Sequence, residues 1–135
     1  MAVDGWILDK SASSRVGDPS VAAELDELAG QLYICPVGEL EYLYSARSSA
    51  DYDALKTALR GSLNLALAPP NIFESVLALQ HELAHHHGMW HRVAIPDLFI
   101  AEIALSSRLG VLHLDGDFER IAEVRPLTVR RLGRA

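Results

Sequence analysis

Short apolar runs alternate along this chain with longer segments of helical periodicity. Runs of strand length occur at 3–9, 32–35 and 111–114, with shorter ones at 65–67 and 127–129. Helical spacing of apolar residues covers 21–28, 37–47, 51–63, 72–87, 96–109 and 117–123. Strands that alternate with helices favour a mainly parallel sheet covered on both faces. We therefore predict an α/β fold of three layers, as one domain spanning residues 1–135.

The composition indicates a packed domain in a reducing compartment. Hydrophobic residues make up 50% of the chain, so a core is expected and disorder is not. Cys35 is the single cysteine, which excludes an intrachain disulfide, and we interpret it as a small core residue. Asp4 and Asp9 stand where a secretory signal would be basic, and no apolar run reaches the roughly 20 residues of a membrane span. We expect a cytoplasmic protein with no membrane association.

The charge is acidic and unevenly distributed. The net charge is −6, which argues against a general polyanion binder because phosphate affinity comes mainly from Lys and Arg. From Arg125 to the end there are four arginines and no acid, so residues 1–124 carry −10. A cation bound among acidic residues inverts the local field, so the acidity does not exclude a nucleic-acid substrate.

Five acidic residues lie at the edges of the apolar segments or within them. Asp9 ends the first strand run, Glu41 lies inside a helical segment, Asp97 follows Ile-Pro, and Asp115 and Asp117 follow the 111–114 run. Ligands of parallel sheets bind beyond the carboxyl ends of strands, where Asp9 and Asp115 are predicted to be. Clustered carboxylates repel one another unless a cation compensates, and Mg²⁺ or Mn²⁺ prefers such oxygen ligands.

The segments 7–12, 41–47, 91–101 and 113–122 carry a family resemblance, in particular through Ile-Pro-Asp at 95–97 and Asp-x-Asp-Phe at 115–118. In this order they resemble the PIN-domain ribonucleases, and most closely the VapC toxins of type II toxin–antitoxin pairs. The resemblance implies a PIN-like fold and a Mg²⁺- or Mn²⁺-dependent endoribonuclease. Such an enzyme hydrolyses RNA phosphodiester bonds with a metal-activated water and leaves a 5′-phosphate and a 3′-hydroxyl.

The resemblance also implies which residues form the site. It assigns catalysis and metal binding to Asp9, Glu41, Asp97 and Asp115, with Asp117 assisting or binding a second ion. Glu39 competes with Glu41, which we prefer because the segment 42–47 aligns with it. Many family members carry Thr or Ser two residues before the fourth acid, whereas this chain has His113.

Substrate and partners are expected from the same reasoning. Lys10, Arg15, Arg47 and Arg92 lie near the acidic motifs in sequence and are expected to hold flanking phosphates. The resemblance implies a VapB-type antitoxin as partner and a homodimer. A PIN-like binding module without catalysis is an alternative, against which the retained acids argue.

Three aromatic residues and the C-terminal arginines are weaker indicators of RNA binding. We interpret Trp6, Tyr42 and Tyr44 as core or interface residues rather than as platforms for bases. The arginines at 130, 131 and 134 either extend a positive track or confer solubility.

A second metal motif competes with the acids. His81, Glu82, His85, Gly88 and His91 satisfy H-E-x-x-H-x-x-G-x-x-H, the zinc signature of metzincin proteases. A zinc metalloprotease using both histidines, Glu82 and His91 is therefore an alternative function. No methionine follows the motif to supply the Met-turn. We interpret the histidines as a polar helix face and helix end, with adventitious Zn²⁺ or Ni²⁺ binding left open.

Overall fold

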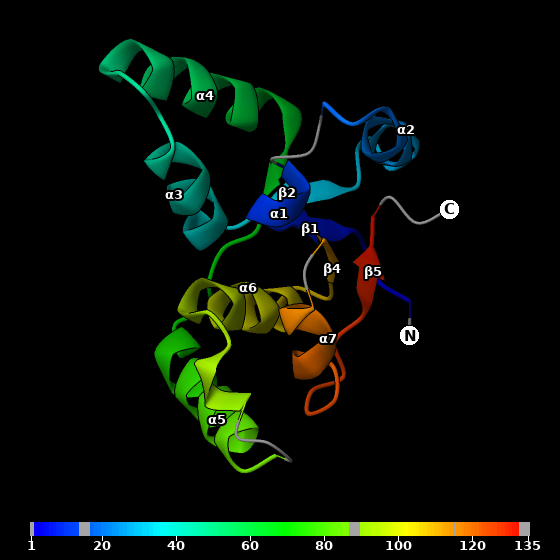
Figure 1. Cartoon of the computed structure of the whole chain (residues 1–135), viewed down its shortest axis with the longest axis vertical. Helices are drawn as coiled ribbons and strands as arrows, with labels where there is room; N and C mark the ends of the chain where they lie inside the picture. The colour runs from blue at the N-terminus through cyan, green and yellow to red at the C-terminus, as the bar shows by residue number, and fades with distance from the viewer. Residues whose placement is uncertain (1, 14–16, 87–89, 115, 133–135) are drawn as a thin grey trace.

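Five short strands form one sheet in the computed structural model, which describes residues 2–13, 17–86, 90–114 and 116–132. They are β1 Trp6–Leu8, β2 Leu32–Ile34, β3 Asn64–Leu65, β4 Gly110–His113 and β5 Val129–Arg131. Their order is β3-β2-β1-β4-β5 and every neighbouring pair is parallel (Figure 1). The α/β fold with a parallel sheet is thus confirmed, and β1 lies at its centre.

The helices are α1 Lys10–Ser13, α2 Pro19–Glu27, α3 Pro36–Tyr44, α4 Ser49–Ser62, α5 Ile72–Ala84, α6 Ile95–Ser106 and α7 Asp117–Ile121, with a 3₁₀ turn η1 at Trp90–Arg92. Side-chain caps set two of their starts. The Asp18 carboxylate accepts from the backbone N–H of Ser20 at 3.0 Å, and the Ser48 hydroxyl accepts from that of Asp51 at 3.0 Å. None of the described helices combines the length and apolar character that crossing a bilayer requires.

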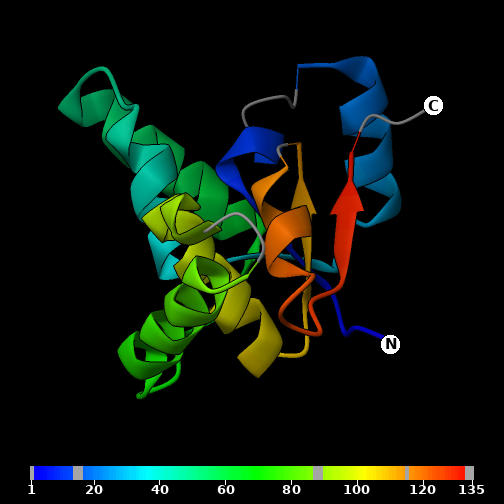
Figure 2. The same ribbon diagram turned by 60° about the horizontal axis from the view of Figure 1, so that its bottom comes forward.

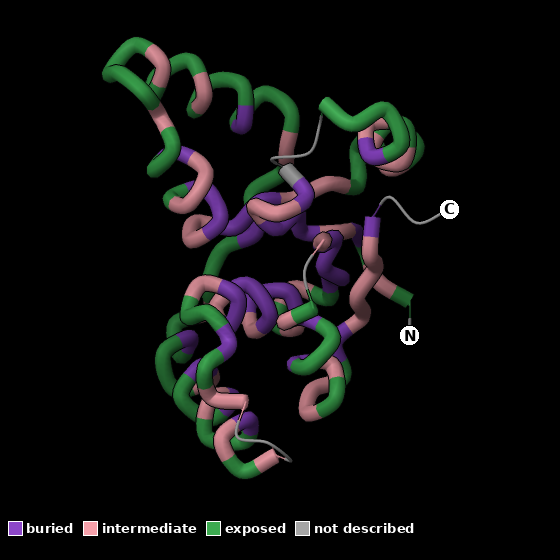
Figure 3. The backbone as a smooth tube through the Cα atoms, viewed as in Figure 1, coloured by how far each residue is buried: buried purple, intermediate pink, exposed green. Residues whose placement is uncertain are grey.

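Alternate residues of the central strands face two different cores. Ile7 and Val111 point into a core shared with α5, α6 and α7, whereas Leu8 and Leu112 pack with α1 and α2. Helices α1 to α4 therefore lie on one side of the sheet and α5 to α7 on the other (Figure 1). Buried residues concentrate on β1, β4 and α6, while α4 is exposed along most of its length (Figure 3).

A glycine allows β1 and β4 to pair closely. Trp6 and Gly110 are partners in the parallel register, and a Cβ on Gly110 would lie 2.5 Å from the Trp6 ring. β5 follows β4 on the other side, and the two strands run next to each other in Figure 2. This packing places the carboxyl ends of β1 and β4 at the same edge of the sheet.

Several boundaries differ from those expected; β1 begins at Trp6 rather than at residue 3, and α3 ends at Tyr44 rather than at residue 47. α6 ends at Ser106, because Arg108 adopts the left-handed conformation with φ of 59° and turns the chain into β4. β5 begins at Val129, two residues later than the apolar run at 127–129 indicates. α5 ends at Ala84, before the predicted end at His87, and residues 87–89 lie outside the described part of the chain.

Cys35 is buried, and burial raises the pKa of its thiol, as befits a core residue.

Candidate metal centre

Three of the five predicted acids converge on one place. Asp9 follows β1, Glu41 projects from α3, and Asp97 lies in the first turn of α6. One carboxylate oxygen from each lies within 4.8 Å of the other two, and we call this set the three-acid group. Asp9 and Asp97 are only 3% and 6% exposed. Segments 32 and 56 residues apart in sequence are therefore brought together by the end of β1, the middle of α3 and the start of α6.

Asp9 is held in place by Ser11. The Ser11 backbone N–H and hydroxyl donate to Asp9 Oδ2 at 3.1 and 2.6 Å. The same hydroxyl accepts from the backbone N–H of Leu114 at 3.0 Å. Ser11 thereby joins the acid after β1 to the backbone after β4. The sequence contains one signal for this role, a hydroxyl two residues after a strand-end acid.

The two glutamates of α3 have separate surroundings. Glu41 enters the three-acid group, as preferred from the sequence, and α3 packs against α1 and α6, which flank the other two acids. Glu39 instead accepts two hydrogen bonds from the Arg60 guanidinium of α4, at 2.7 and 2.9 Å. The pairing with Arg60 lowers the pKa of Glu39. Glu39 is therefore a link between helices rather than a candidate ligand.

The three-acid group fits a hard divalent cation. Mg²⁺ and Mn²⁺ take carboxylate oxygens as ligands and usually retain positions for water or phosphate. Two largely buried carboxylates and a third half-buried one, held this close, repel one another, and a bound cation would offset that repulsion. The donor set is all oxygen, which disfavours zinc relative to magnesium or manganese.

Asp115 and Asp117 are the other two predicted acids. Asp115 lies outside the described residues. Asp117 begins α7 and accepts from Arg120 at 3.2 Å, and it is not a member of the three-acid group. His113, where Thr or Ser was expected, is fully buried in β4, with its ring 5.7 Å from that of Phe118. Within the described ranges neither nitrogen of this imidazole has a hydrogen-bond partner.

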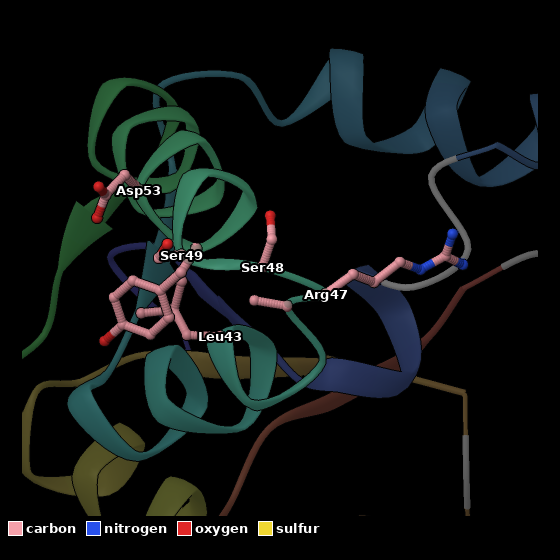
Figure 4. Close-up of a pocket in the computed structure, with 7 residues that line it drawn as sticks. Leu43, Arg47, Ser48, Ser49 and Asp53 are labelled. Atoms are coloured by element: carbon pink, nitrogen blue, oxygen red, sulfur yellow. The ribbon is translucent and has the colours of Figure 1, made fainter.

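The expected substrate cations are not equally placed. Lys10 lines a hollow that also contains Glu41. Arg47 lines a separate hollow between α3 and α4, where its side chain extends away from Ser49 and Asp53 (Figure 4). Arg92 is exposed on η1, and Arg15 lies outside the described residues.

The C-terminal arginines have acidic partners. Arg130 pairs with Glu24 of α2 at 3.1 Å, and Arg131 pairs with Glu119 of α7 at 3.0 Å. These contacts attach β5 to helices on both faces of the sheet. They favour a structural role for the two side chains over a continuous positive track, and Arg134 lies outside the described residues.

The zinc motif is not assembled as a metzincin site. Glu82, the would-be general base, forms an ion pair with Arg125. The rings of His81 and His85 stack with centroids 4.3 Å apart, and His85 Nδ1 donates to the carbonyl oxygen of His81 at 2.7 Å. Among the described residues, only the three-acid group brings three potential metal ligands together. The structure therefore does not favour the zinc protease alternative.

A parallel α/β sheet with an acidic centre at its carboxyl edge is shared with a known family of proteins. The PIN domain model matches residues 7–124. The chain therefore belongs to the PIN-domain family, as its sequence motifs suggested.

Relatives within that family place the chain in its VapC group. Ribonuclease VapC17 of Mycobacterium tuberculosis is 55% identical over 124 residues, which cover 90% of this chain and 90% of that protein. Ribonuclease VapC21 of the same species is 37% identical over 121 residues, with coverage of 88% and 87%.

Solved structures share the fold at low sequence identity. VapBC2 from Rickettsia felis, bound to a DNA fragment from its promoter, has a chain that matches with a TM-score of 0.77 and 16% identity, covering 94% of this chain and 98% of that chain. DNA-bound VapBC from Salmonella typhimurium matches with a TM-score of 0.73 and 18% identity, with coverage of 94% and 97%. At these identities the likeness supports the fold alone.

Proposed function

We propose that this protein is the toxin of a type II toxin–antitoxin pair and acts as a Mg²⁺- or Mn²⁺-dependent endoribonuclease. The observation that carries the proposal is the convergence of Asp9, Glu41 and Asp97 at the carboxyl edge of the sheet. The relatives named as VapC ribonucleases, which the chain matches over most of its length, support the same activity.

The chain's own residues would act as follows. Asp9, Glu41 and Asp97 hold the cation, and Asp115 and Asp117 complete its acidic surroundings. When bound, the ion supplies Lewis acidity to the scissile phosphate and acidifies a water molecule. Glu41 or Asp97 accepts a hydrogen bond from the attacking water and orients it. Hydrolysis then leaves a 5′-phosphate on one fragment and a 3′-hydroxyl on the other.

The proposed partners are a VapB-type antitoxin and a second copy of the chain. The solved structures that share the fold are described as VapBC assemblies, which supports an antitoxin partner here. The substrate is RNA, which meets the acidic face through the bound cation and nearby basic side chains, Lys10 in particular.

The test is cleavage of total RNA by the purified protein with Mg²⁺, with Mn²⁺ and with EDTA. Asp9→Asn and Asp97→Asn should each lower cleavage by roughly 100-fold or more, because even outer partners of metal ligands are worth roughly 10–100-fold. Asp26→Asn, an exposed acid on α2, is the matched control and should cleave like the wild type. Metal-dependent cleavage retained by both site variants would overturn the proposal, and a wild type that binds RNA without cutting it would favour the inactive module.

A further inference from the structure

A hollow of about 460 Å³ opens next to the three-acid group. Its lining consists of one acid of that group, one lysine and four residues with apolar or aromatic surface: Glu41, Lys10, Val37, Leu40, Tyr44 and Pro96. We call it the Tyr44 hollow. The mixture of an aromatic ring, aliphatic surface and a cation differs from the purely carboxylate surface of the neighbouring centre.

The Tyr44 hollow and the three-acid group are built from the same elements. Lys10 directly follows Asp9, and Pro96 directly precedes Asp97. Glu41 belongs to both, and α3 contributes the apolar wall. An RNA strand with its scissile phosphate at the three-acid group can run toward α3. The adjacent nucleotide of that strand then lies over the Tyr44 hollow.

Tyr44 is the most exposed large hydrophobic side chain among the described residues, at 89%, and Leu40 one turn earlier is 67% exposed. Tyr44 was interpreted as a core or interface residue, and this exposure excludes the core. Tyr44 lies one helical turn from Glu41, on the same side of α3. An exposed ring beside a phosphate-binding centre is suited to stack on a nucleobase, because every base offers a π-face.

We propose that Tyr44 is a stacking platform for the base next to the scissile phosphate, with Lys10 holding a phosphate of the same nucleotide. The inference rests on the proposed ribonuclease function and deepens it by assigning one of its substrate contacts. Bases within an A-form duplex are stacked on their neighbours and cannot reach a protein ring. The contact with Tyr44 therefore requires a base that is not paired and stacked within a duplex.

The experiment compares steady-state cleavage of a single-stranded RNA oligonucleotide by wild type, Tyr44→Ala, Tyr44→Leu and Tyr44→Phe. Base–aromatic stacking corresponds to a change of roughly ten-fold in KM, so Tyr44→Ala should raise KM about that much with little change in kcat. Tyr44→Phe should restore the wild-type KM, and Tyr44→Leu should not. Tyr52→Ala, a half-exposed tyrosine of α4 that lines the other hollow, is the matched control and should leave KM unchanged.

Each contrary result has a distinct meaning. If Tyr44→Ala has the KM of the wild type, Tyr44 is not a stacking platform. The proposed function still stands in that case, provided that the wild type shows metal-dependent cleavage. If Tyr44→Leu and Tyr44→Phe both keep the wild-type KM, the contact with the base is apolar and does not depend on aromatic stacking. Sedimentation of the same variants tests the rival occupant, a second copy of the chain. Loss of a dimer in Tyr44→Ala with an unchanged KM would assign Tyr44 to that interface and overturn the proposal, as would a wild type that cleaves no RNA.

Discussion

Two glutamates separated by a single residue on α3 have different partners, and the difference depends on a residue far away in sequence. Glu39 accepts a forked pair of hydrogen bonds from Arg60, whereas Glu41 joins Asp9 and Asp97. The motif around Glu41 favoured the correct glutamate for this group. The role of Arg60 was not predictable, because the pairing requires α4 to fold back along α3.

Glu41→Gln and Glu39→Gln should therefore have opposite phenotypes. Glu41→Gln should lose RNA cleavage and keep or gain thermal stability, since it removes repulsion within the three-acid group. Glu39→Gln should keep cleavage and melt a few degrees lower, because the Arg60 pair is partly exposed and contributes modestly. Thermal melting and cleavage assays on both proteins check this, and a stable, inactive Glu39→Gln would contradict it.

The low pKa of Glu39 gives the pair a pH dependence. A carboxylate whose pKa is lowered on folding adds stability above its ordinary value of 4.5 and loses it as the pH falls through the lower, folded value. The melting difference between wild type and Glu39→Gln should therefore be constant near neutral pH and shrink only in acid.

At the scale of elements, the arginine that follows α7 connects it to α5 and α6. Arg125 pairs with Glu82 of α5 and, at 3.2 Å, with Glu102 of α6. The zinc-like string on α5 could not reveal this, because a motif read along the chain does not include a partner 43 residues away. By contrast, the order and type of the strands and main helices followed from periodicity, while the ends of α6 and β5 depended on local backbone conformation.

Arg125→Ala should destabilise the protein by about 2–3 kcal/mol, because the largely buried Glu102 would lose the counter-charge of Arg125. Burial already raises the pKa of Glu102 despite Arg125. A carboxyl with a raised folded pKa is a penalty at neutral pH that disappears as the pH falls through that value. Urea unfolding should therefore show a smaller deficit at about pH 5 than at about pH 7.5. Lys56→Ala on α4 is the control, and a deficit that grows in acid would contradict the expectation.

At the scale of the whole molecule, an ion that binds only the folded chain links metal to stability. The carboxylates of β1, α3 and α6 come together only after the sheet and both helix layers have formed. Part of this was foreseeable: five acids in separate motifs were expected to share one site, and Asp9 was expected at the carboxyl end of a strand. The hydroxyl bridge of Ser11 and the exposed ring of Tyr44 were not, because both depend on how the elements pack.

Mg²⁺ should therefore raise the melting temperature, and EDTA should reverse the rise. At an ion concentration 100 times the dissociation constant, the folded state gains about 2.7 kcal/mol. Asp97→Asn should abolish the gain, whereas His85→Ala should preserve it. Calorimetric scans of the three proteins at several Mg²⁺ concentrations provide the measurement. A gain that survives in Asp97→Asn and disappears in His85→Ala would move the ion to the histidines.

The central position of β1 also determines how late in synthesis the sheet can be completed. β1 leaves the ribosome before the other strands of the sheet, yet one of its two neighbours, β4, begins only at Gly110. Domains complete such long-range pairing late in translation. In a polypeptide that ends before Gly110, one edge of β1 would have no strand to pair with. The Ser11 hydroxyl would also lack the hydrogen bond that the Leu114 backbone N–H donates to it. Under the proposed function, products that end before Gly110 should therefore not cleave RNA.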